Sequence, residues 1–448
     1  MKNANGKIAC ALALLCLVVP MFASYFFDDM FSTVSQIFQH PESLELGWNS
    51  ADYGFYAGGY SFLCVCGGLI VCGILLDIYG VRKIGSAFVA MMIAGAGVVL
   101  YALLSGLPPR TSLVIAYTGC MLFGLGSEIS GVAVMRSIAK WFKGRNVAFA
   151  MGLQVAIARL GTASALVLAP MLVASKGDGG IYSLAETARP AEVGLALLLL
   201  GGILWAVFVA MDAAFDRKAG IERSHGESGA TEDKFKFSDI LKLLSNKRFI
   251  FIALLCVFFY CCCISFKKFG TAIVIPRFGM EAESARWMIS LLPFFTVVFT
   301  PLFGALIDRV GGASKWMIAA SLMVLGAHAI LRFAPEGAPV FGYIGIGILG
   351  IGYSLIPSAL WPSVPKIVPD KNLGTAYSLL YWIQNIGLML VPIAIGSIFN
   401  SFEALRAAET AEYMFILLAV AAVAASVMLS RQSAAMPELG LDAPNKKK

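Results

Sequence analysis

The sequence of 448 residues contains few charged side chains and only three histidines. Asp, Glu, Lys and Arg make up 14% of the chain, whereas soluble domains carry about 25%. Hydrophobic residues make up 59%. The chain has no phosphate-binding loop, nucleophilic triad or ATP motif, so the sequence does not indicate an enzyme or an ATP-driven machine. This composition is typical of an integral membrane protein.

Cysteine is missing from every loop, because all ten cysteines fall in apolar segments. The sequence therefore predicts neither a disulfide framework nor a zinc site. The run Cys261–Cys262–Cys263 has no histidine nearby, and we interpret these residues as small packing side chains. No metal and no other cofactor is expected. There is also no Asn-x-Ser/Thr glycosylation acceptor anywhere in the chain.

Long apolar segments fill most of the sequence, and about 20 such residues suffice to cross a bilayer as a helix. The first run has no small-residue cleavage site and is expected to stay in the protein as a helix. The fold predicted is an all-α membrane protein whose twelve helices form two pseudo-symmetric six-helix bundles. The spans are expected near 8–38, 51–76, 84–104, 112–140, 146–174, 191–212, 249–276, 284–307, 316–333, 340–366, 372–400 and 411–430.

Basic residues predict the orientation of these spans, because cytoplasmic loops are rich in Lys and Arg. If the N-terminus is cytoplasmic, the inner stretches hold 24 of the 34 basic residues and the outer loops hold seven. We therefore expect both termini in the cytoplasm. We attribute the net charge of +7 to the basic residues of the cytoplasmic loops and do not interpret it as a sign of nucleic-acid binding. The predicted parts are bundles over 1–212 and 249–431, a partly flexible cytoplasmic linker over 213–248, and a tail over 432–448.

Two internal repeats relate the halves of the chain. The inner loop after span two contains Gly73, Asp77, Gly80, Arg82 and Lys83, and the loop after span eight carries the degenerate copy Gly304, Asp308, Arg309 and Gly311. We expect Asp77 to cap a neighbouring helix and to pair with Arg82 or Lys83 as an inner latch. With a shift of 226 residues, spans four and five align with spans ten and eleven, which pairs Glu128 with Ser354 and Arg159 with Asn385.

Glu128 and Arg159 lie near mid-depth of two neighbouring spans. A charge there costs at least about 2.5–3.5 kcal/mol, so it is normally paired or faces a watery cavity. A carboxylate suits a ligand ammonium, and a guanidinium suits a ligand carboxylate. The two charges together therefore predict a site for a zwitterion, although they could instead neutralise each other as a buried pair.

The inner-loop motif of residues 73–83 matches the signature of the major facilitator superfamily, which the chain resembles. Further stretches resemble the branch whose animal members are lysosomal dipeptide uniporters: SYFFDD (24–29), WFKGRNVAFAMGLQVAIARLG (141–161), GYSLIPSALWP (352–362), VPDKNLGTAY (368–377) and IQNIGL (383–388). The resemblance implies facilitated transport of dipeptides, with Glu128 on the amine and Arg159 on the carboxylate. Asn385, Trp382, Asp29 and Tyr25 complete the expected substrate-binding set.

Charges near the far ends of spans one and seven suggest a second gate. Asp28 and Asp29 could face Lys267 and Lys268 at similar depth and close the outer side. Alternatively, Asp29 lies at the cavity roof and helps Glu128 hold the substrate amine, or one of the lysines extends to the interface and matters little. His328 in span nine has no evident partner in the sequence and is expected to be buried bulk.

The sequence thus predicts a monomeric transporter in the lipid bilayer that works by alternating access and moves small zwitterions, most plausibly dipeptides, by uniport. A proton-coupled symporter or an exchanger of organic anions is the first alternative, and a non-transporting receptor or scaffold is the second. The short N-terminus lacks an acidic dileucine motif, and the outer loops are short. These features favour a bacterial inner-membrane protein.

Overall fold

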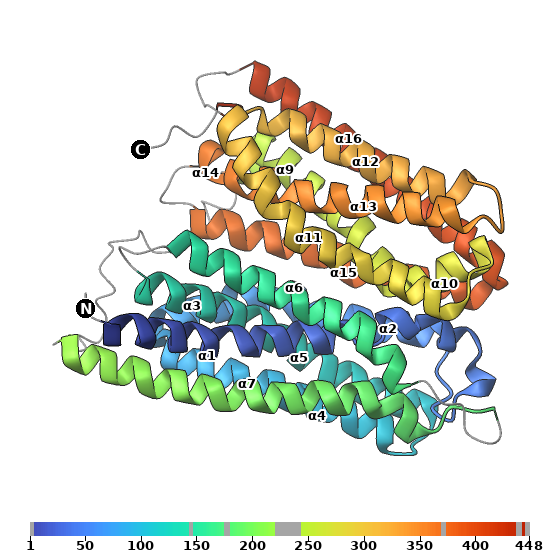
Figure 1. Ribbon diagram of the computed structural model, residues 1–448, viewed down its shortest axis with the longest axis horizontal. Coiled ribbons are helices and arrows are strands. Elements are labelled where there is room, and N and C mark those ends of the chain that lie inside the picture. The colour runs from blue at the N-terminus through green and yellow to red at the C-terminus, as the bar shows by residue number, and fades with distance from the viewer. Residues whose placement is uncertain are drawn as a thin grey trace. The chain divides into compact units, whose positions relative to one another are not determined.

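The computed structural model describes residues 4–142, 147–173, 180–219, 243–368, 373–435 and 441–443, and its regular elements are helices (Figure 1). The first half contains α1 (Ala4–Asp29), η1 (Ser32–Gln39), η2 (Pro41–Ser43), α2 (Ser50–Leu63), η3 (Cys64–Gly68), α3 (Leu69–Gly80), η4 (Val81–Gly85), α4 (Ser86–Leu104), α5 (Pro109–Trp141), α6 (Val147–Leu172) and α7 (Leu184–Ala219). The second half contains α9 (Lys247–Tyr260), η5 (Cys261–Ser265), α10 (Phe266–Phe278), α11 (Ala282–Val310), α12 (Ala313–Phe333), α13 (Pro339–Leu360), η6 (Trp361–Ser363), α14 (Val364–Ile367), α15 (Leu373–Ser401) and α16 (Ala404–Ala434).

The predicted twelve-span helical fold is confirmed. Within the described residues, twelve helical stretches are long and apolar enough to cross a membrane, from Ile8–Gln39 to Ala404–Ala434. Helices suit these apolar segments because each one satisfies its own backbone hydrogen bonds without water. The chain is therefore an integral, multi-pass membrane protein. Most of the predicted linker, residues 220–242, lies outside the described residues.

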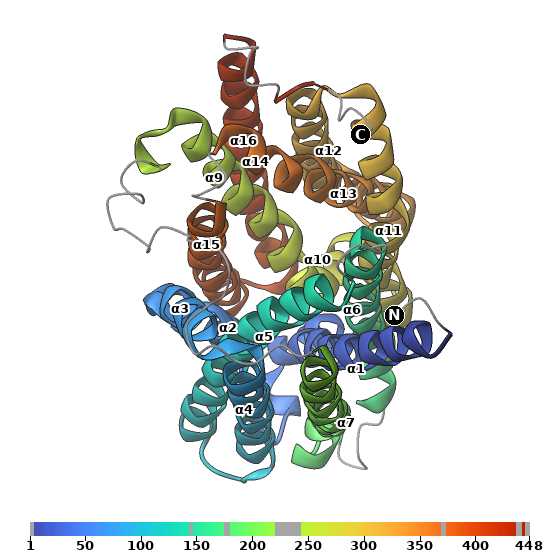
Figure 2. The ribbon, with the colours of Figure 1, turned by 90° about the vertical axis from the view of Figure 1, so that its left-hand side faces the viewer.

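The chain divides into two compact units. The first comprises residues 1–30 and 59–231, and the second comprises residues 31–58 and 232–448. In the first unit α1 packs against α6 and α7, and α4 packs against α5. In the second unit α12 packs against α13 and α16, and α10 packs against η1. Figure 2 shows α4, α7 and α15 foreshortened, whereas α1 is seen from the side.

Spans one and seven are among the spans whose α-helix is interrupted. Span one is α-helical to Asp29 and continues after a turn as the 3₁₀ helix η1. Span seven contains the π-helical turn η5, formed by the cysteine run and the two residues that follow it. π-Helical turns inside α-helices are frequent at functional sites. The interruption in span one directly follows Asp28 and Asp29, and the interruption in span seven lies just before Lys267 and Lys268.

Residues 441–443 lie against the end of the second unit where α12 begins. The carboxylate of Asp442 accepts hydrogen bonds from the backbone N–H of Ser314 at 2.7 Å and from its hydroxyl at 2.9 Å. Lys366 donates to the carbonyl oxygen of Ala443 at 3.0 Å. Because free N–H groups at a helix start favour an anion, Asp442 serves as a remote cap of α12.

The prediction that His328 is buried bulk without a partner is wrong. Its Nδ1 lies 2.8 Å from Oε2 of Glu412, and both side chains are fully buried. The imidazole stacks on Phe415, with ring centroids 5.0 Å apart, and meets the edge of Phe266 at 5.3 Å. Glu412 lies on α16, 84 residues along the chain, so neither residue reveals the other in the sequence.

We expect the substitution His328→Leu to destabilise the second unit, because it leaves the Glu412 carboxyl buried without its partner. Removing one member of a buried pair costs about 3–5 kcal/mol, whereas replacing both members by apolar residues is often neutral. The double variant His328→Leu/Glu412→Leu should therefore recover most of the loss. Thermal unfolding of the purified protein measures both changes.

The control for this comparison is Leu322→Ala on the exposed face of α12. It should change the unfolding midpoint little. Equal midpoints for the single and double His328 variants would contradict a stabilising role for the pair.

Candidate functional site

Helix α1 of the first unit presents two carboxylates and an aromatic ring from its last turns. Asp29 is buried and accepts a hydrogen bond from the hydroxyl of Thr162 on α6 at 2.8 Å, whereas Asp28 is half-buried. Tyr25, one turn earlier, is also half-buried. The packing of α1 against α6 thus brings the sequence-predicted acids of span one close to span five.

Arg159 on α6 lies over the ring of Tyr25, with its guanidinium carbon 5.7 Å from the ring centroid. A guanidinium over an aromatic face gains electrostatic stabilisation, and more of it when water is excluded. Both side chains are half-buried. The structure therefore brings together two residues that the sequence assigned to the same binding set.

Glu128 on α5 is half-buried, and its Oε1 accepts a hydrogen bond from the hydroxyl of Tyr60 on α2 at 3.1 Å. The same tyrosine hydroxyl lies 3.2 Å from Oγ of Ser127. Ser127 in turn shares a hydrogen bond of 2.5 Å with Ser24 on α1. The carboxylate is thus connected to three helices of the first unit.

The second unit carries the repeat-related residues, and its side chains are neutral at these positions. Ser354 is fully buried and donates to the carbonyl oxygen of Gly350 at 2.7 Å. Asn385 is 2% exposed, and its Nδ2 donates to the carbonyl oxygen of Tyr381 at 2.9 Å. Its Oδ1 is buried and finds no donor among the residues that the structure describes. Trp382, three residues earlier, is half-buried.

An aromatic cluster in the second unit surrounds Trp361. Its ring stacks on Tyr381, with centroids 5.0 Å apart, and its indole N–H donates to the hydroxyl of Tyr260 at 2.9 Å. The hydroxyl of Tyr377 donates to the carbonyl oxygen of Trp361 at 3.2 Å. Because Tyr260 belongs to span seven, the cluster joins spans seven, ten and eleven, and nothing in the sequence indicated that Tyr260 is part of it.

Residues 31–58, which we call the first connector, pack against α10 of the second unit. Ser35 lies 3.2 Å from the hydroxyl of Thr271, and Gln39 donates to the carbonyl oxygen of Ala272 at 3.3 Å. The hydroxyl of Tyr53 donates to the carbonyl oxygen of Lys268 at 3.1 Å. These contacts are neutral, and sequence analysis did not single out any of the three connector residues.

The first connector also makes a tight backbone contact with α15. A side chain at Gly54 would bring its Cβ within 2.4 Å of the carbonyl oxygen of Pro392, and one at Gly396 would approach the carbonyl oxygen of Ser50 equally closely. Real Cβ atoms do not approach so near, so glycine is required at both positions. Lys267 and Lys268 on α10 are 5% and 6% exposed, so both predicted gate lysines are buried.

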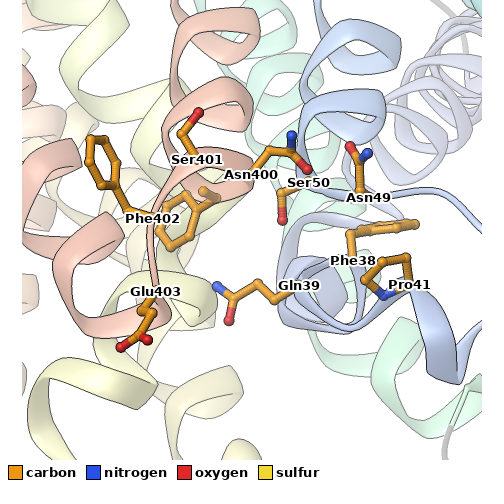
Figure 3. A pocket seen from close by; sticks show the side chains of 10 residues that line it. Phe38, Gln39, Pro41, Asn49, Ser50, Asn400, Ser401, Phe402 and Glu403 are labelled. Carbon is orange, nitrogen blue, oxygen red and sulfur yellow. The ribbon is translucent and has the colours of Figure 1, made fainter.

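A pocket of about 340 Å³ lies between the first connector and the junction of α15 with α16 (Figure 3). Gln39 and Asn49 line one side, and Asn400, Ser401 and Glu403 line the other. None of the predicted substrate-binding residues lines it. We therefore regard this pocket as part of the connector's packing and keep it separate from the charged residues of the first unit.

The predicted inner-latch residue Arg82 binds two carboxylates that the sequence motif does not contain. Its Nε donates to Asp212 on α7 at 2.6 Å, and its Nη2 binds Asp216. Lys140 lies 2.8 Å from each of these aspartates, and the indole N–H of Trp141 donates to Asp212 at 2.8 Å. Two cations and two anions thus join η4, α5 and α7.

The other residues of the two motif copies are placed as follows. Gly73 and Gly80 lie on α3, and Lys83 on η4 is exposed. Asp77 belongs to α3, but its side chain lies outside what the structure describes. Asp308 and Arg309 of the second copy are exposed at the end of α11. The latch role of these residues stays a prediction.

Sequence reasoning missed the partners of several site residues. Tyr60, Thr162 and Asp212 each lie on a span different from that of the residue they bind. Asp212 could have been noticed as an acid at the end of span six, facing basic residues at the same side of the membrane. Tyr60 and Thr162 carry no comparable signal, because hydroxyl residues are common in membrane helices.

Twelve helical stretches able to cross a membrane among the described residues, with buried and half-buried charges on the helices of the first unit, are typical of a membrane transporter. The chain matches the Major Facilitator Superfamily over residues 17–277 and 257–438, and it belongs to that superfamily. It is therefore a transporter of small molecules and not an enzyme.

Among known proteins, the chain is similar to the lysosomal dipeptide transporter MFSD1 of Danio rerio, with 29% identity over 93% of this chain and 86% of that protein. The protein of the same name from Homo sapiens is 28% identical over 87% of this chain and 80% of its own length. In fold, the chain resembles the nucleoside transporter NupG, with a TM-score of 0.68, 14% identity and coverage of 94% and 99%. The inward-open xylose transporter XylE from E. coli gives a TM-score of 0.69, with 11% identity and coverage of 95% and 96%.

We expect Asp212→Asn to destabilise the first unit, because Asp212 is 6% exposed and accepts hydrogen bonds from Arg82, Lys140 and Trp141. The substitution removes the charge that two cations share, which should cost about 2 kcal/mol. Thermal unfolding of the purified protein measures the loss. Glu192→Gln, at an exposed position of the same helix α7, is the matched control and should unfold as the wild type does.

Proposed function

We propose that the chain moves dipeptides across the membrane by alternating access, as a facilitated uniporter. Support comes from the dipeptide-transporting relatives at 28–29% identity together with the charges of the first unit. In this proposal Arg159 binds the peptide carboxylate and Glu128 binds the amine. Asn385, Trp382, Asp29 and Tyr25 complete the binding set, and no nucleic acid, cofactor or second subunit is involved.

The observation that carries the proposal is the unequal number of acids and bases on the interior helices of the first unit. Asp28, Asp29 and Glu128 provide three carboxylates, and Arg159 provides one guanidinium. An excess of carboxylates attracts a ligand that has an ammonium group and repels a dianion. A dipeptide with both termini free has one charge of each sign and suits this set.

Asn385 supports the same ligand class from the second unit. Its buried Oδ1 lacks a donor among the described residues, and a buried acceptor without a donor is costly. Its Nδ2 donates to the carbonyl oxygen of Tyr381. If the amide were rotated by 180°, Oδ1 would face that carbonyl oxygen, and two acceptors would lie against each other. The N–H of a peptide bond would satisfy Oδ1, whereas a dicarboxylate has no donor to offer.

A proton-coupled symporter or an exchanger of organic anions is the second candidate. The buried Asp29, which accepts a hydrogen bond from Thr162, is the observation in its favour, because buried carboxyls within membrane spans often carry protons in transporters. In that case Arg159 would bind a carboxylate substrate, and Asp29 or Glu128 would carry the proton.

The orientation and location are part of the same proposal. We infer that both termini are cytoplasmic, because 24 of the 34 basic residues would then lie on the inner side. We infer a bacterial inner membrane from the absence of glycosylation acceptors and from the short outer loops. The two proposed six-span bundles cover residues 1–212 and 249–431, and alternating access is the mechanism that such repeated bundles use.

The first connector is our candidate for the outer gate, together with Asp28, Lys267 and Lys268. With the termini cytoplasmic, the connector lies on the outer side of the membrane. Its hydrogen bonds to α10 and the close contact of Gly54 with Gly396 would hold that side closed. The two lysines add buried positive charge to the same helix, and a buried cation requires compensating negative charge.

The proposed transport activity predicts that liposomes containing the wild-type protein take up labelled alanyl-alanine until the two sides equilibrate. Uptake should not need a proton gradient and should survive an uncoupler. Arg159→Ala should lower uptake at least ten-fold, because a bidentate contact to the peptide carboxylate is lost. Uptake that collapses with the uncoupler, or transport of dicarboxylates alone, would favour the second candidate.

Arg136→Ala is a matched control for Arg159→Ala, because Arg136 lies at the inner end of α5, outside the binding set. Its loss should leave uptake within about two-fold of the wild type. If Arg136→Ala and Arg159→Ala lowered uptake equally, a specific role of Arg159 would be contradicted.

The proposed outer gate predicts that a disulfide between Ser35→Cys and Thr271→Cys stops transport. The two hydroxyl oxygens are 3.2 Å apart, which is compatible with the geometry of a disulfide. An oxidant should abolish uptake of alanyl-alanine, and a reductant should restore it. Each single cysteine variant, which carries the ten native cysteines, is the control. Normal uptake by the fully cross-linked protein would show that this contact does not open during transport.

A further inference from the structure

The hydroxyl of Tyr60 forms a chain of hydrogen bonds that ends at Glu128. It donates at 3.1 Å to Oε1 of Glu128 and lies 3.2 Å from Oγ of Ser127. Ser127 and Ser24 are 2.5 Å apart, so the chain crosses from α1 through α5 to α2. All four residues belong to the first unit.

Gly124 explains why Tyr60 can reach the carboxylate. A Cβ at position 124 would lie 2.0 Å from the backbone carbonyl oxygen of Tyr60, so only glycine lets α2 approach α5 this closely. Glu128 is one helical turn further along α5, on the same face as Gly124. The ring of Phe123 meets the Tyr60 ring edge-on, with centroids 5.9 Å apart, and limits its movement.

We propose that Tyr60 is a positioning residue that sets the orientation of the Glu128 carboxylate for a ligand ammonium. The inference rests on the proposed function. The last torsion of a glutamate side chain is broad, so an unrestrained carboxylate rotates freely. With Oε1 held by Tyr60, the second oxygen keeps a fixed direction and remains available for the ligand. Tyr60 therefore acts through Glu128 and need not touch the substrate.

A positioning role of Tyr60 can be distinguished from a purely structural role by which ligands lose affinity when Tyr60 is replaced. A residue that orients the amine-binding carboxylate matters only for ligands that have the amine. A residue that merely supports the packing of α2 against α5 affects every ligand and the stability of the protein. Alanyl-alanine and N-propionyl-alanine provide the needed comparison, because they differ only in that a hydrogen replaces the ammonium group.

The experiment measures the Kd of both ligands by calorimetry for the purified full-length wild type and for Tyr60→Phe. We expect the Kd of alanyl-alanine to rise about ten-fold, because a hydrogen bond to a charged group is lost. The Kd of N-propionyl-alanine should change less than two-fold. Tyr101→Phe on the exposed face of α4 is the matched control and should leave both values unchanged.

A double-mutant cycle adds a second readout. In a Glu128→Gln background, Tyr60→Phe should change the Kd of alanyl-alanine less than two-fold, because the oriented carboxylate is already absent. An equal loss for both ligands, or an undiminished effect of Tyr60→Phe in the Glu128→Gln background, would overturn the positioning role.

A ligand-independent measurement separates this inference from the proposed function. A membrane-permeant carbodiimide should label Glu128 faster in Tyr60→Phe than in the wild type, because the phenol hydroxyl no longer covers Oε1. Mass spectrometry of the labelled peptide follows the rate. If wild-type protein bound no dipeptide but labelling accelerated, the positioning role would stand and the peptide assignment would fall. Unchanged labelling would overturn the positioning role whatever the substrate is.

Discussion

The constraint on which this structure depends is that a polar group inside a bilayer must find its partner within the protein. Water is absent there, and an unsatisfied group costs several kilocalories per mole. Several polar groups meet the constraint by joining different helices. Asp29 accepts a hydrogen bond from Thr162 of another span, and His328 is hydrogen-bonded to Glu412. The same bonds that satisfy these groups also fix how neighbouring helices lie side by side.

The two units use this constraint differently. Charged groups of the first unit gather on the helices that carry the proposed ligand contacts, whereas the repeat-related positions of the second unit hold Ser354 and Asn385. A buried hydrogen-bonded pair of the second unit, His328 with Glu412, lies instead between α12 and α16. Duplication has therefore preserved the helices and the motif positions, while the charge chemistry has been redistributed between the halves.

The spans and the superfamily could be predicted from sequence because both depend on local patterns. Twenty apolar residues make a span wherever they occur, and the motif around Gly73 and Arg82 is contiguous. Partners across helices could not be predicted in this way. Nothing near His328 in the chain indicates Glu412, and nothing near Glu128 indicates Tyr60, because helix packing alone brings them together. The turn that separates α1 from η1 was not predicted either, since Asp28 and Asp29 were interpreted as charges within one continuous span.

The first connector gives the chain an unusual covalent path. Because residues 31–58 belong to the second unit, the backbone passes from one unit to the other three times: after residue 30, after residue 58 and after residue 231. The long central loop is thus only one of three covalent links. A protease that cut this loop would divide the sequence into halves and yet leave the units tethered through the first two helices. The N-terminal fragment would keep the whole first unit, whereas the C-terminal fragment would lack residues 31–58 of the second unit, so the two halves of the sequence do not coincide with the two units of the folded protein.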